Sequence, residues 1–432
     1  MRDATLPRPG LRSVTLGRGV RLHVLPTDRF ATTVVRVALH RDLGPEATAT
    51  SLLGAVLESA TARHPTREAL AHRLADLYGA GLSVGVEKLG NRQLLSATLD
   101  WPTVGLAGRG ASLADGLAFL REVLTEPLRD ADGLDPGLVA TEARNLGRAL
   151  ASIRDDKARY ATRRCLEAAC RGDAYALDVE GRVEDLAAAT PRALDALHRR
   201  LLSTAPVEVF VVGDVAPAAA RAAVARHLLW PGRAPRPATV PDVASVRAAR
   251  TRPVRAVEHD AVAQGKLVMA WRAPVEPASR DLAPALLLAG VLGGTAVSRL
   301  FKVVRETHGL CYAASAGWVR SQGLLLVQLG VAPEHAARAR RLTTSLVAEV
   351  AAGRLEPAAH EAVVEGARAR VAALADERGS SVAFLQEALA LGTTRSPARH
   401  LAALRAVTSK DVARVGRRLR PEASFLLTGP AA

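Results

Sequence analysis

Side chains able to bind a peptide backbone occur at close spacing in one short segment of this chain, residues 298–312. Leu300, Val303 and Val304 share one face of a helix in this segment, which predicts an amphipathic helix. Gly309 is expected to end that helix, because glycine readily adopts the left-handed backbone conformation that other residues resist. A strand is expected to begin immediately after this turn.

The turn at Gly309 would bring the guanidinium of Arg305 close to the phenol of Tyr312. Both groups donate hydrogen bonds, and two donors that point the same way could hold a peptide carbonyl. The alternative is an ordinary surface helix followed by a half-buried tyrosine. The spacing of the residues alone does not decide between these two interpretations.

Two short motifs at fixed spacing lie in this segment: Ser-Arg-Leu-Phe from residue 298 and Arg-Glu-x-x-Gly-Leu-x-Tyr from residue 305. Together they closely resemble the second-half signature of the pitrilysin/insulinase family of zinc metallopeptidases. Gly293 and Gly294 match the glycine-rich stretch of that signature. In that family the arginine and tyrosine bind the substrate backbone beside the scissile bond. The resemblance therefore implies a substrate-binding role for Arg305 and Tyr312.

The zinc motif of that family is missing from this chain. Members that cleave peptides carry His-x-x-Glu-His on an early helix, where two histidines ligate zinc and the glutamate activates the bound water. Here the motif positions fall on Ser51, Gly54 and Ala55, and none of these residues can bind zinc or act as the base. The family's further glutamate ligand would fall near Ala149, and no acidic residue follows Glu142 for a dozen positions. The resemblance thus implies no metal and no catalytic residue in this chain.

A different histidine-based zinc site also has little support in the sequence. No His-Glu-x-x-His occurs anywhere, and His360-Glu361 has no second histidine within reach. His64 and His72 flank the start of a helix eight residues apart, so we expect them to be capping or solvent-exposed residues.

The three cysteines give weak signals of chemistry. Cys165 and Cys170 have no second pair of ligands nearby, so they do not form a zinc motif. Cys311 is expected to be a small buried hydrophobic residue. An autonomous enzyme that uses Cys311 or a serine remains a third possibility, although only His308 lies near that cysteine in the sequence.

Composition limits the classes of function. The net charge is +15 over 432 residues, but the arginines are spread along the chain and aromatic residues make up only 3 %, which argues against nucleic-acid binding. No apolar run is long enough to span a membrane, and the N-terminus lacks the apolar core of a secretion signal. Three cysteines are too few for a disulfide framework, so we expect a cytoplasmic protein.

Two halves with a common plan flank a Pro/Arg-rich linker. Residues 33–39 and 266–272 open the halves as alternating apolar strands, and each is followed by a helix that ends at glycine. Second strands follow at 94–99 and 324–329, then long helices, and closing strands at 207–212 and 424–427. This order predicts an α+β fold in which helices cover a largely antiparallel mixed sheet in each of two homologous domains.

We place the domain boundaries accordingly at 1–230, 231–255 for the linker, and 256–432. The first domain would hold the degenerate zinc site, and the last would hold Arg305 and Tyr312. Internal duplication is also a feature of the insulinase family, and the resemblance implies its clamshell-type chain.

The resemblance extends to bacterial family members without the zinc motif, through residues 78–80, 155–161 and 210–214. Such proteins are commonly produced beside a zinc-bearing sister, and the two subunits form a heterodimer that encloses a chamber. The resemblance implies a non-catalytic, substrate-binding subunit of a zinc metallopeptidase, inactive alone, with zinc in its partner and a peptide as substrate. Removal of leader peptides from ribosomally made peptide natural products is one expected process. The alternative is a structural subunit that touches no substrate.

Overall fold

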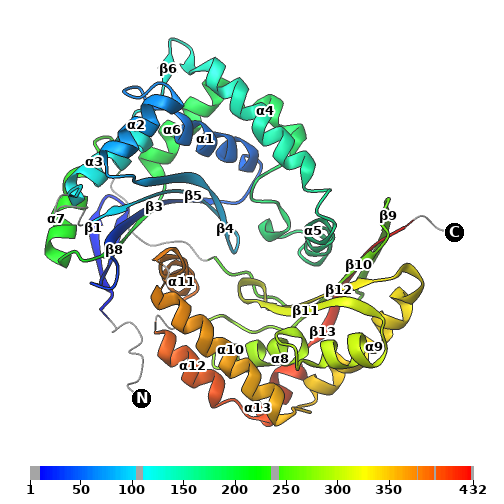
Figure 1. Cartoon of the computed structure of the whole chain (residues 1–432). Coiled ribbons are helices and arrows are strands. Elements are labelled where there is room, and N and C mark those ends of the chain that lie inside the picture. The colour runs from blue at the N-terminus through cyan, green and yellow to red at the C-terminus, as the bar shows by residue number, and fades with distance from the viewer. Residues whose placement is uncertain (1–9, 104–109, 235–242, 377, 394–395, 430–432) are drawn as a thin grey trace. The chain divides into compact units, whose positions relative to one another are not determined.

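The computed structural model describes residues 10–103, 110–234, 243–376, 378–393 and 396–429 (Figure 1). The N-terminal stretch examined for a secretion signal lies outside these residues, as does part of the predicted 231–255 linker. In the part of the chain that is described, no helix is both long and apolar enough to cross a membrane.

The chain packs into two compact units that interleave along the sequence. As far as the ranges are described, unit 1 comprises Met1–Ala151, Leu177–Pro241 and Leu374–Gln386, and unit 2 comprises Ser152–Ala176, Asp242–Ala373 and Glu387–Ala432. The two units are groups of residues that pack together in space, whereas the predicted boundaries at 230 and 256 divide the chain into consecutive segments. The division into domains at those boundaries therefore stays a prediction.

Unit 1 contains a six-stranded mixed sheet. Its strands in spatial order are β1 (Arg12–Gly17), β2 (Val20–Pro26), β8 (Val207–Gly213), β3 (Thr32–Asp42), β5 (Arg92–Pro102) and β4 (Gly81–Leu89). Only β2 and β8 pair in parallel, and every other neighbouring pair is antiparallel. The short strands β6 (Arg129–Asp130) and β7 (Gly133–Leu134) form a separate hairpin.

The helices of unit 1 contribute apolar residues to a core against this sheet. They are α1 (Ala47–Ser59), α2 (Arg67–Asp76), α3 (Leu113–Thr125), α4 (Pro136–Ser152), α6 (Pro191–Thr204) and α7 (Pro217–Leu228). Short 3₁₀ turns follow at η2 (Ala174–Ala176), in unit 2, and η3 (Val183–Ala188). The core joins alternate strand residues such as Leu22 and Val37 to Leu53 of α1, all fully buried.

Unit 2 contains a five-stranded mixed sheet. Its strands in spatial order are β11 (Cys311–Val319), β12 (Leu324–Val331), β10 (Gly265–Arg272), β13 (Arg420–Thr428) and β9 (Val254–His259). Again one pair is parallel, β13 with β9, and the others are antiparallel. The edge strands of this sheet are therefore β11 and β9.

Helices cover both faces of the second sheet. The remaining helical elements of unit 2 are α5 (Lys157–Ala169), α8 (Leu282–Gly293), η4 (Leu300–Thr307), η5 (Arg320–Gln322), η6 (Pro333–His335), α9 (Ala336–Ala351), α10 (Pro357–Asp376), α12 (Pro397–Arg405) and α13 (Ser409–Gly416). Helix α11 (Arg378–Ala390) belongs to unit 1 as far as Gln386. Figure 1 shows α8, α9 and α13 on one face and α5 on the other. Met269 and Trp271 of β10 enter the core with α8 and α9, while Val268 and Ala270 pack with α5.

The strand order confirms the predicted α+β fold and the common plan of the two halves. The order β8, β3, β5, β4 in unit 1 corresponds to β13, β10, β12, β11 in unit 2, with β2 and β9 as the matching parallel neighbours. The predicted strands at 33–39 and 266–272 are β3 and β10, and the predicted closing strands are β8 and β13. Strands β1, β2 and β9 are not anticipated by the sequence analysis.

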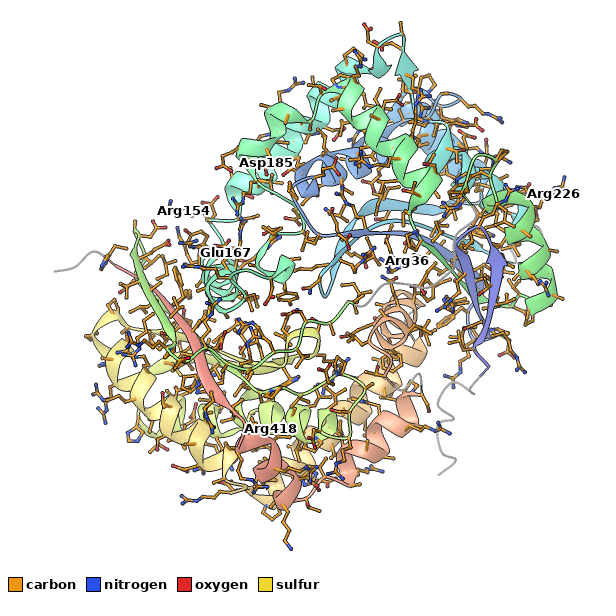
Figure 2. The ribbon with its side chains drawn as sticks, turned by 180° about the vertical axis from the view of Figure 1, so that it is seen from behind. Arg36, Arg154, Glu167, Asp185, Arg226 and Arg418 are labelled. Atoms are coloured by element: carbon orange, nitrogen blue, oxygen red, sulfur yellow. The ribbon has the colours of Figure 1, made fainter. Side chains whose placement is uncertain are left out.

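A buried carboxylate holds the start of the second half in place. Glu422 is fully buried, and it accepts hydrogen bonds from Arg247 Nη2 at 2.8 Å and from the Arg250 backbone N–H at 2.9 Å. Arg272, also fully buried, lies 3.4 Å from the same carboxylate. On the α5 side, Arg154 pairs with Asp260 just beyond β9, and Figure 2 labels this arginine. Ion pairs therefore fasten residues 243–250 and α5 to the second sheet.

Candidate functional site

The helix that carries Arg305 ends at Gly309 as predicted. Leu300 and Val304 are fully buried, and Val303 packs against the same core. Gly309 has φ of +59°, and its N–H bonds to the Arg305 carbonyl at 3.0 Å, which is the bond of an αL helix end. The turn directs the chain into β11.

The turns of this helix are wider than those of an α-helix. The His308 N–H bonds to the Val303 carbonyl, five residues back, at 3.1 Å. Helical turns of this kind are rare and occur frequently at functional sites. Arg299 fixes the start of the helix, with ion pairs to Glu349 at 2.9 Å and Glu356 at 2.6 Å.

Arg305 is exposed at the last turn of this helix. Its guanidinium carbon lies 4.4 Å from the centroid of the Phe301 ring, and its Nε lies 3.3 Å from a carboxylate oxygen of Glu306. The aromatic face and the neighbouring carboxylate orient the guanidinium while leaving 42 % of the side chain exposed.

The Tyr312 side chain lies on the face of the second sheet that α5 also contacts. It extends from β11 over β12 toward β10. Tyr312 is the extra residue of a bulge in β11, between Cys311 and Ala313, and 40 % of it is exposed. Its ring passes over Gly330 of β12, where any Cβ would collide with the ring. The hydroxyl reaches β10, where Lys266 Nζ donates a hydrogen bond to it and lies 4.9 Å from the ring centroid. Tyr312 is thus held by a lysine and a glycine from two other strands.

The glycine-rich segment positions β11. A Cβ at Gly293 would collide with the backbone of β11 at Ser315 and Ala316, and one at Gly294 would lie 2.9 Å from the Gly290 carbonyl oxygen. Because Gly293 has no side chain, the end of α8 can approach the edge strand this closely. Gly293 and Gly294 therefore contribute to the site through packing.

The positions of the missing zinc motif are filled by packing and by hydrogen bonds to the backbone. Ser51 Oγ donates to the carbonyls of Ala47 at 3.1 Å and Val179 at 3.2 Å. A Cβ at Gly54 would lie 3.3 Å from Gly85 Cα, so a glutamate there would push α1 away from β4. Ala55 offers only a methyl group. These residues do not fit a zinc ion.

The acidic residue on the same helix as the predicted second ligand position is already satisfied. Glu142 on α4 accepts hydrogen bonds from Ser59 at 3.0 Å, Arg67 at 2.8 Å and Asn145 at 3.0 Å. Burial alone would raise the pKa of Glu142, but these hydrogen bonds lower the pKa overall. Ala149, at the predicted position itself, has no ligand atom. Among the residues described, no group of three His, Cys, Asp or Glu side chains could hold a metal ion.

The remaining candidate groups have structural roles. Cys311 is buried, and burial raises the pKa of its thiol to about 11 despite the nearby Arg305, so it is not an activated nucleophile. Cys165 is likewise buried, with its pKa raised to about 12. His64 Nδ1 lies 2.7 Å from Glu122, and His72 lies 3.9 Å from Glu68, so the two histidines serve different carboxylates.

Comparisons with known proteins agree with this geometry. Residues 188–366 match the family model described as "Peptidase M16 inactive domain". The chain is 26 % identical over 420 residues to the probable inactive metalloprotease YmfF of Bacillus subtilis (strain 168). The aligned region covers 95 % of this chain and 96 % of that protein. These matches support a non-catalytic member of the M16 (pitrilysin/insulinase) peptidase family. Among the residues that the structure describes, none forms a zinc site.

Solved structures show the same M16 fold over nearly the whole chain. A conserved protein from Enterococcus faecalis V583 is 26 % identical, with a TM-score of 0.90 and coverage of 98 % of this chain and 99 % of that one. The peptidase M16 inactive domain from Pseudomonas fluorescens is 17 % identical, with a TM-score of 0.77, 98 % coverage of this chain and 99 % of that one.

Lys266 and Gly330 are the residues of this site that the sequence analysis misses. Lys266 lies in a segment identified as a strand, and Gly330 ends another. Their contact with Tyr312 depends on the order β11, β12, β10 and on the pairing of Lys266 with Gly330. Only the strand register reveals it, because 46 residues separate Lys266 from Tyr312.

Proposed function

We propose that this chain is the substrate-binding subunit of a heterodimeric zinc metallopeptidase, inactive alone, with the zinc ion in its partner. Arg305 and Tyr312 would hold the backbone of the peptide while the partner cleaves it. Removal of leader peptides from ribosomally made peptide natural products is the process we favour. The three cysteines are free and buried, which fits a reducing cytoplasm as the place of action.

The observation that carries this proposal is the pair of exposed donors beside a free sheet edge. Arg305 and Tyr312 flank the turn into β11, which is an edge strand with one neighbour, β12. Tyr312, Ala313, Ser315 and Gly317 are exposed, and three of these four side chains are small. A peptide could add to this edge through main-chain hydrogen bonds, while the two donors fix its carbonyl groups.

Binding of this kind can contribute to catalysis without a metal. Holding a peptide in the reactive geometry removes translational and rotational freedom, which can lower a barrier by several kcal/mol. A subunit that has lost the zinc ligands can therefore still determine the rate of cleavage by its partner.

The test is reconstitution with the zinc-bearing sister subunit that carries His-x-x-Glu-His. The purified chain should not cleave peptides, and the mixture should. Arg305→Ala and Tyr312→Phe should each lower kcat/KM about tenfold or more, while both variants still co-purify with the partner. Arg354→Ala, a charge-removing control in the same unit, should leave cleavage unchanged. Full activity in both site variants would refute the substrate-binding role.

The second candidate function is a structural subunit. Under that hypothesis the chain would co-purify with its partner, and neither Arg305→Ala nor Tyr312→Phe would alter any peptidase activity. The exposed tyrosine argues against it, because a scaffold has no need of a phenol held over a glycine by a lysine from a third strand.

A further inference from the structure

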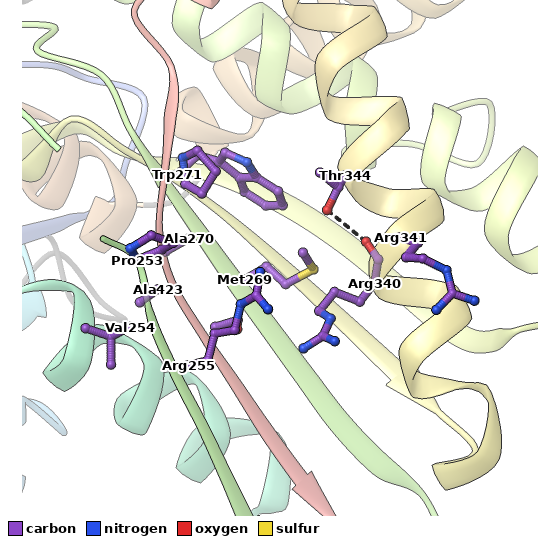
Figure 3. Close-up of a pocket in the computed structure, with 12 residues that line it drawn as sticks. Pro253, Val254, Arg255, Met269, Ala270, Trp271, Arg340, Arg341, Thr344 and Ala423 are labelled. Atoms are coloured by element: carbon purple, nitrogen blue, oxygen red, sulfur yellow. Dashed lines mark hydrogen bonds between the residues drawn. The ribbon is translucent and has the colours of Figure 1, made fainter. Parts of the chain in front are cut away.

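A second candidate site lies at the opposite edge of the sheet in unit 2, on the other face from Tyr312. It is a cavity of about 410 Å³ between strands β9, β10 and β13 and helix α9 (Figure 3). This volume is within the range of small-molecule and side-chain pockets. All of its lining residues belong to unit 2.

Three arginines line this cavity: Arg255 from β9, and Arg340 and Arg341 from α9. Figure 3 shows Arg255 and Arg340 extending toward each other from opposite walls, with Arg341 turned away. None of the three guanidinium groups has a hydrogen bond or ion pair to any residue that the structure describes. Like charges that share a cavity without a carboxylate create a positive potential that attracts an anion.

The floor of the cavity is apolar. Met269 and Trp271 of β10 line it and are 6 % and 4 % exposed, and the Ser424 hydroxyl lies beside them on β13. An occupant therefore needs a negative group for the arginines and a carbon body for the floor. A glutamate or aspartate side chain on an extended backbone satisfies both requirements.

The strand beside the cavity has a free edge. β9 pairs only with β13, and within the described part of the chain no other backbone bonds to its outer side. Val257 follows Arg255 by two positions, so both side chains lie on the same face of the strand, and Val257 is 55 % exposed. Tyr160 and Arg164 of α5 bind Glu258 on the opposite face.

We propose that β9 and this cavity bind an extended acidic peptide segment by strand addition. The segment would place a carboxylate between Arg255 and Arg340, and an apolar residue two positions away against Val257. Main-chain hydrogen bonds along the free edge would supply part of the affinity, and the arginines would supply selectivity for acid. This site is independent of the peptide-binding role proposed for Arg305 and Tyr312.

The test is binding of labelled peptides to the full chain by fluorescence anisotropy. The probe is a C-terminally amidated heptapeptide of threonine and valine with one glutamate and a leucine two positions away, and the fluorophore is attached to its N-terminus. Three matched peptides serve as comparisons: one with glutamine for glutamate, one with N-methyl groups on alternate amides, and one of scrambled order. We expect the parent peptide to bind, the glutamine peptide to bind about tenfold more weakly, and the N-methyl peptide not to bind.

Protein variants locate the binding. Arg255→Gln combined with Arg340→Gln should weaken binding of the acidic peptide at least tenfold and leave the glutamine peptide unaffected. Arg252→Gln, which removes one positive charge just before β9 but outside the cavity, should bind like the parent chain. Added salt should weaken the acidic peptide more than the glutamine peptide, a comparison that needs no variant.

Three results would overturn the proposal: equal binding of the glutamate and glutamine peptides, undiminished binding by the folded double variant, or equal binding of the N-methyl peptide. If the double variant aggregates and the parent chain binds the glutamate and glutamine peptides equally, then the role of Arg255 is to protect the exposed edge of β9 from self-association.

Discussion

At the scale of single residues, the arrangement around Tyr312 explains how an exposed phenol stays in one orientation. The ring rests on the backbone of Gly330, and Lys266 both donates to its hydroxyl and lies over its face. Because the lysine uses the oxygen as an acceptor, the Tyr312 proton remains available to a peptide carbonyl. A hydrogen bond from a charged donor also strengthens the one that the hydroxyl can donate.

Lys266→Ala should therefore impair cleavage by the reconstituted heterodimer through Tyr312. We expect kcat/KM to fall about three- to tenfold, less than in Tyr312→Phe, because the phenol remains but loses its orientation. Lys266→Arg should restore part of the loss. In the Tyr312→Phe background, Lys266→Ala should have little further effect. Additive losses in the double variant would mean that Lys266 acts independently of Tyr312.

At the scale of elements, two glycines support β11 by different contacts. Substitution by alanine should therefore affect stability at one of them and cleavage at the other. A Cβ at Gly293 would meet the backbone of β11, whereas one at Gly330 would meet the movable ring of Tyr312. Gly293→Ala should therefore lower the free energy of unfolding by about 1–3 kcal/mol, the usual cost of overpacking. Gly330→Ala should change it by less than about 1 kcal/mol but displace the ring and lower cleavage.

Urea unfolding and the cleavage assay, applied to both variants, check this contrast. Thr307→Ala, at an exposed position near the turn, is the control and should alter neither measurement strongly. Equal stability of Gly293→Ala and the parent chain would show that α8 can move away from β11 without cost.

The elements themselves are largely predictable from the sequence, because their signals are local. Leu300, Val303 and Val304 define the apolar face of the helix, and Gly309 defines its end. The partners of these elements are not predictable in this way. Ala161 and Cys165 mark an apolar face on α5, but nothing in the sequence says that this face packs on Val268 and Phe425 of the second sheet. That pairing depends on contacts about 100 or more residues apart, which local patterns do not encode.

At the scale of the whole molecule, duplication and interleaving are combined in one chain. Each unit repeats one sheet plan, yet α5 lies in the first half of the sequence and packs in unit 2. The buried Arg272 of β10 fixes this connection, because its Nη2 donates a hydrogen bond to the carbonyl of Ala169, the last residue of α5, at 3.0 Å. The repeated hydrophobic pattern made the plan visible in the sequence, whereas the buried charges had no recognisable pattern. The same holds for the cavity at β9, since Arg255 and Arg340 are 85 positions apart and meet only in the folded unit.

A buried histidine in unit 1 and a half-buried histidine in unit 2 make both units sensitive to acid. In unit 1, His198 is 1 % exposed, and its Nε2–H donates to the Leu124 carbonyl at 2.7 Å while Nδ1 accepts from Arg129 at 2.9 Å. Burial lowers the pKa of His198 to about 4, from 6.5 for an exposed histidine. In unit 2, burial and then Arg320 lower the pKa of His400 to about 4. Between about pH 4 and pH 6.5, the unfolded chain therefore binds more protons than the folded chain.

The sign of the effect follows from this difference. The free energy of unfolding should be constant with respect to these histidines above pH 6.5 and should fall as the pH decreases toward 4. His198→Gln keeps a neutral donor and acceptor but cannot be protonated, so the loss of stability between pH 7 and pH 5 should shrink by about 1 kcal/mol or more. His72→Gln, on a side chain that is 78 % exposed, is the control for the substitution itself. Urea unfolding at a series of pH values measures both variants. An identical pH dependence in His198→Gln and the parent chain would mean that His198 is protonated as readily in the folded state as in the unfolded one.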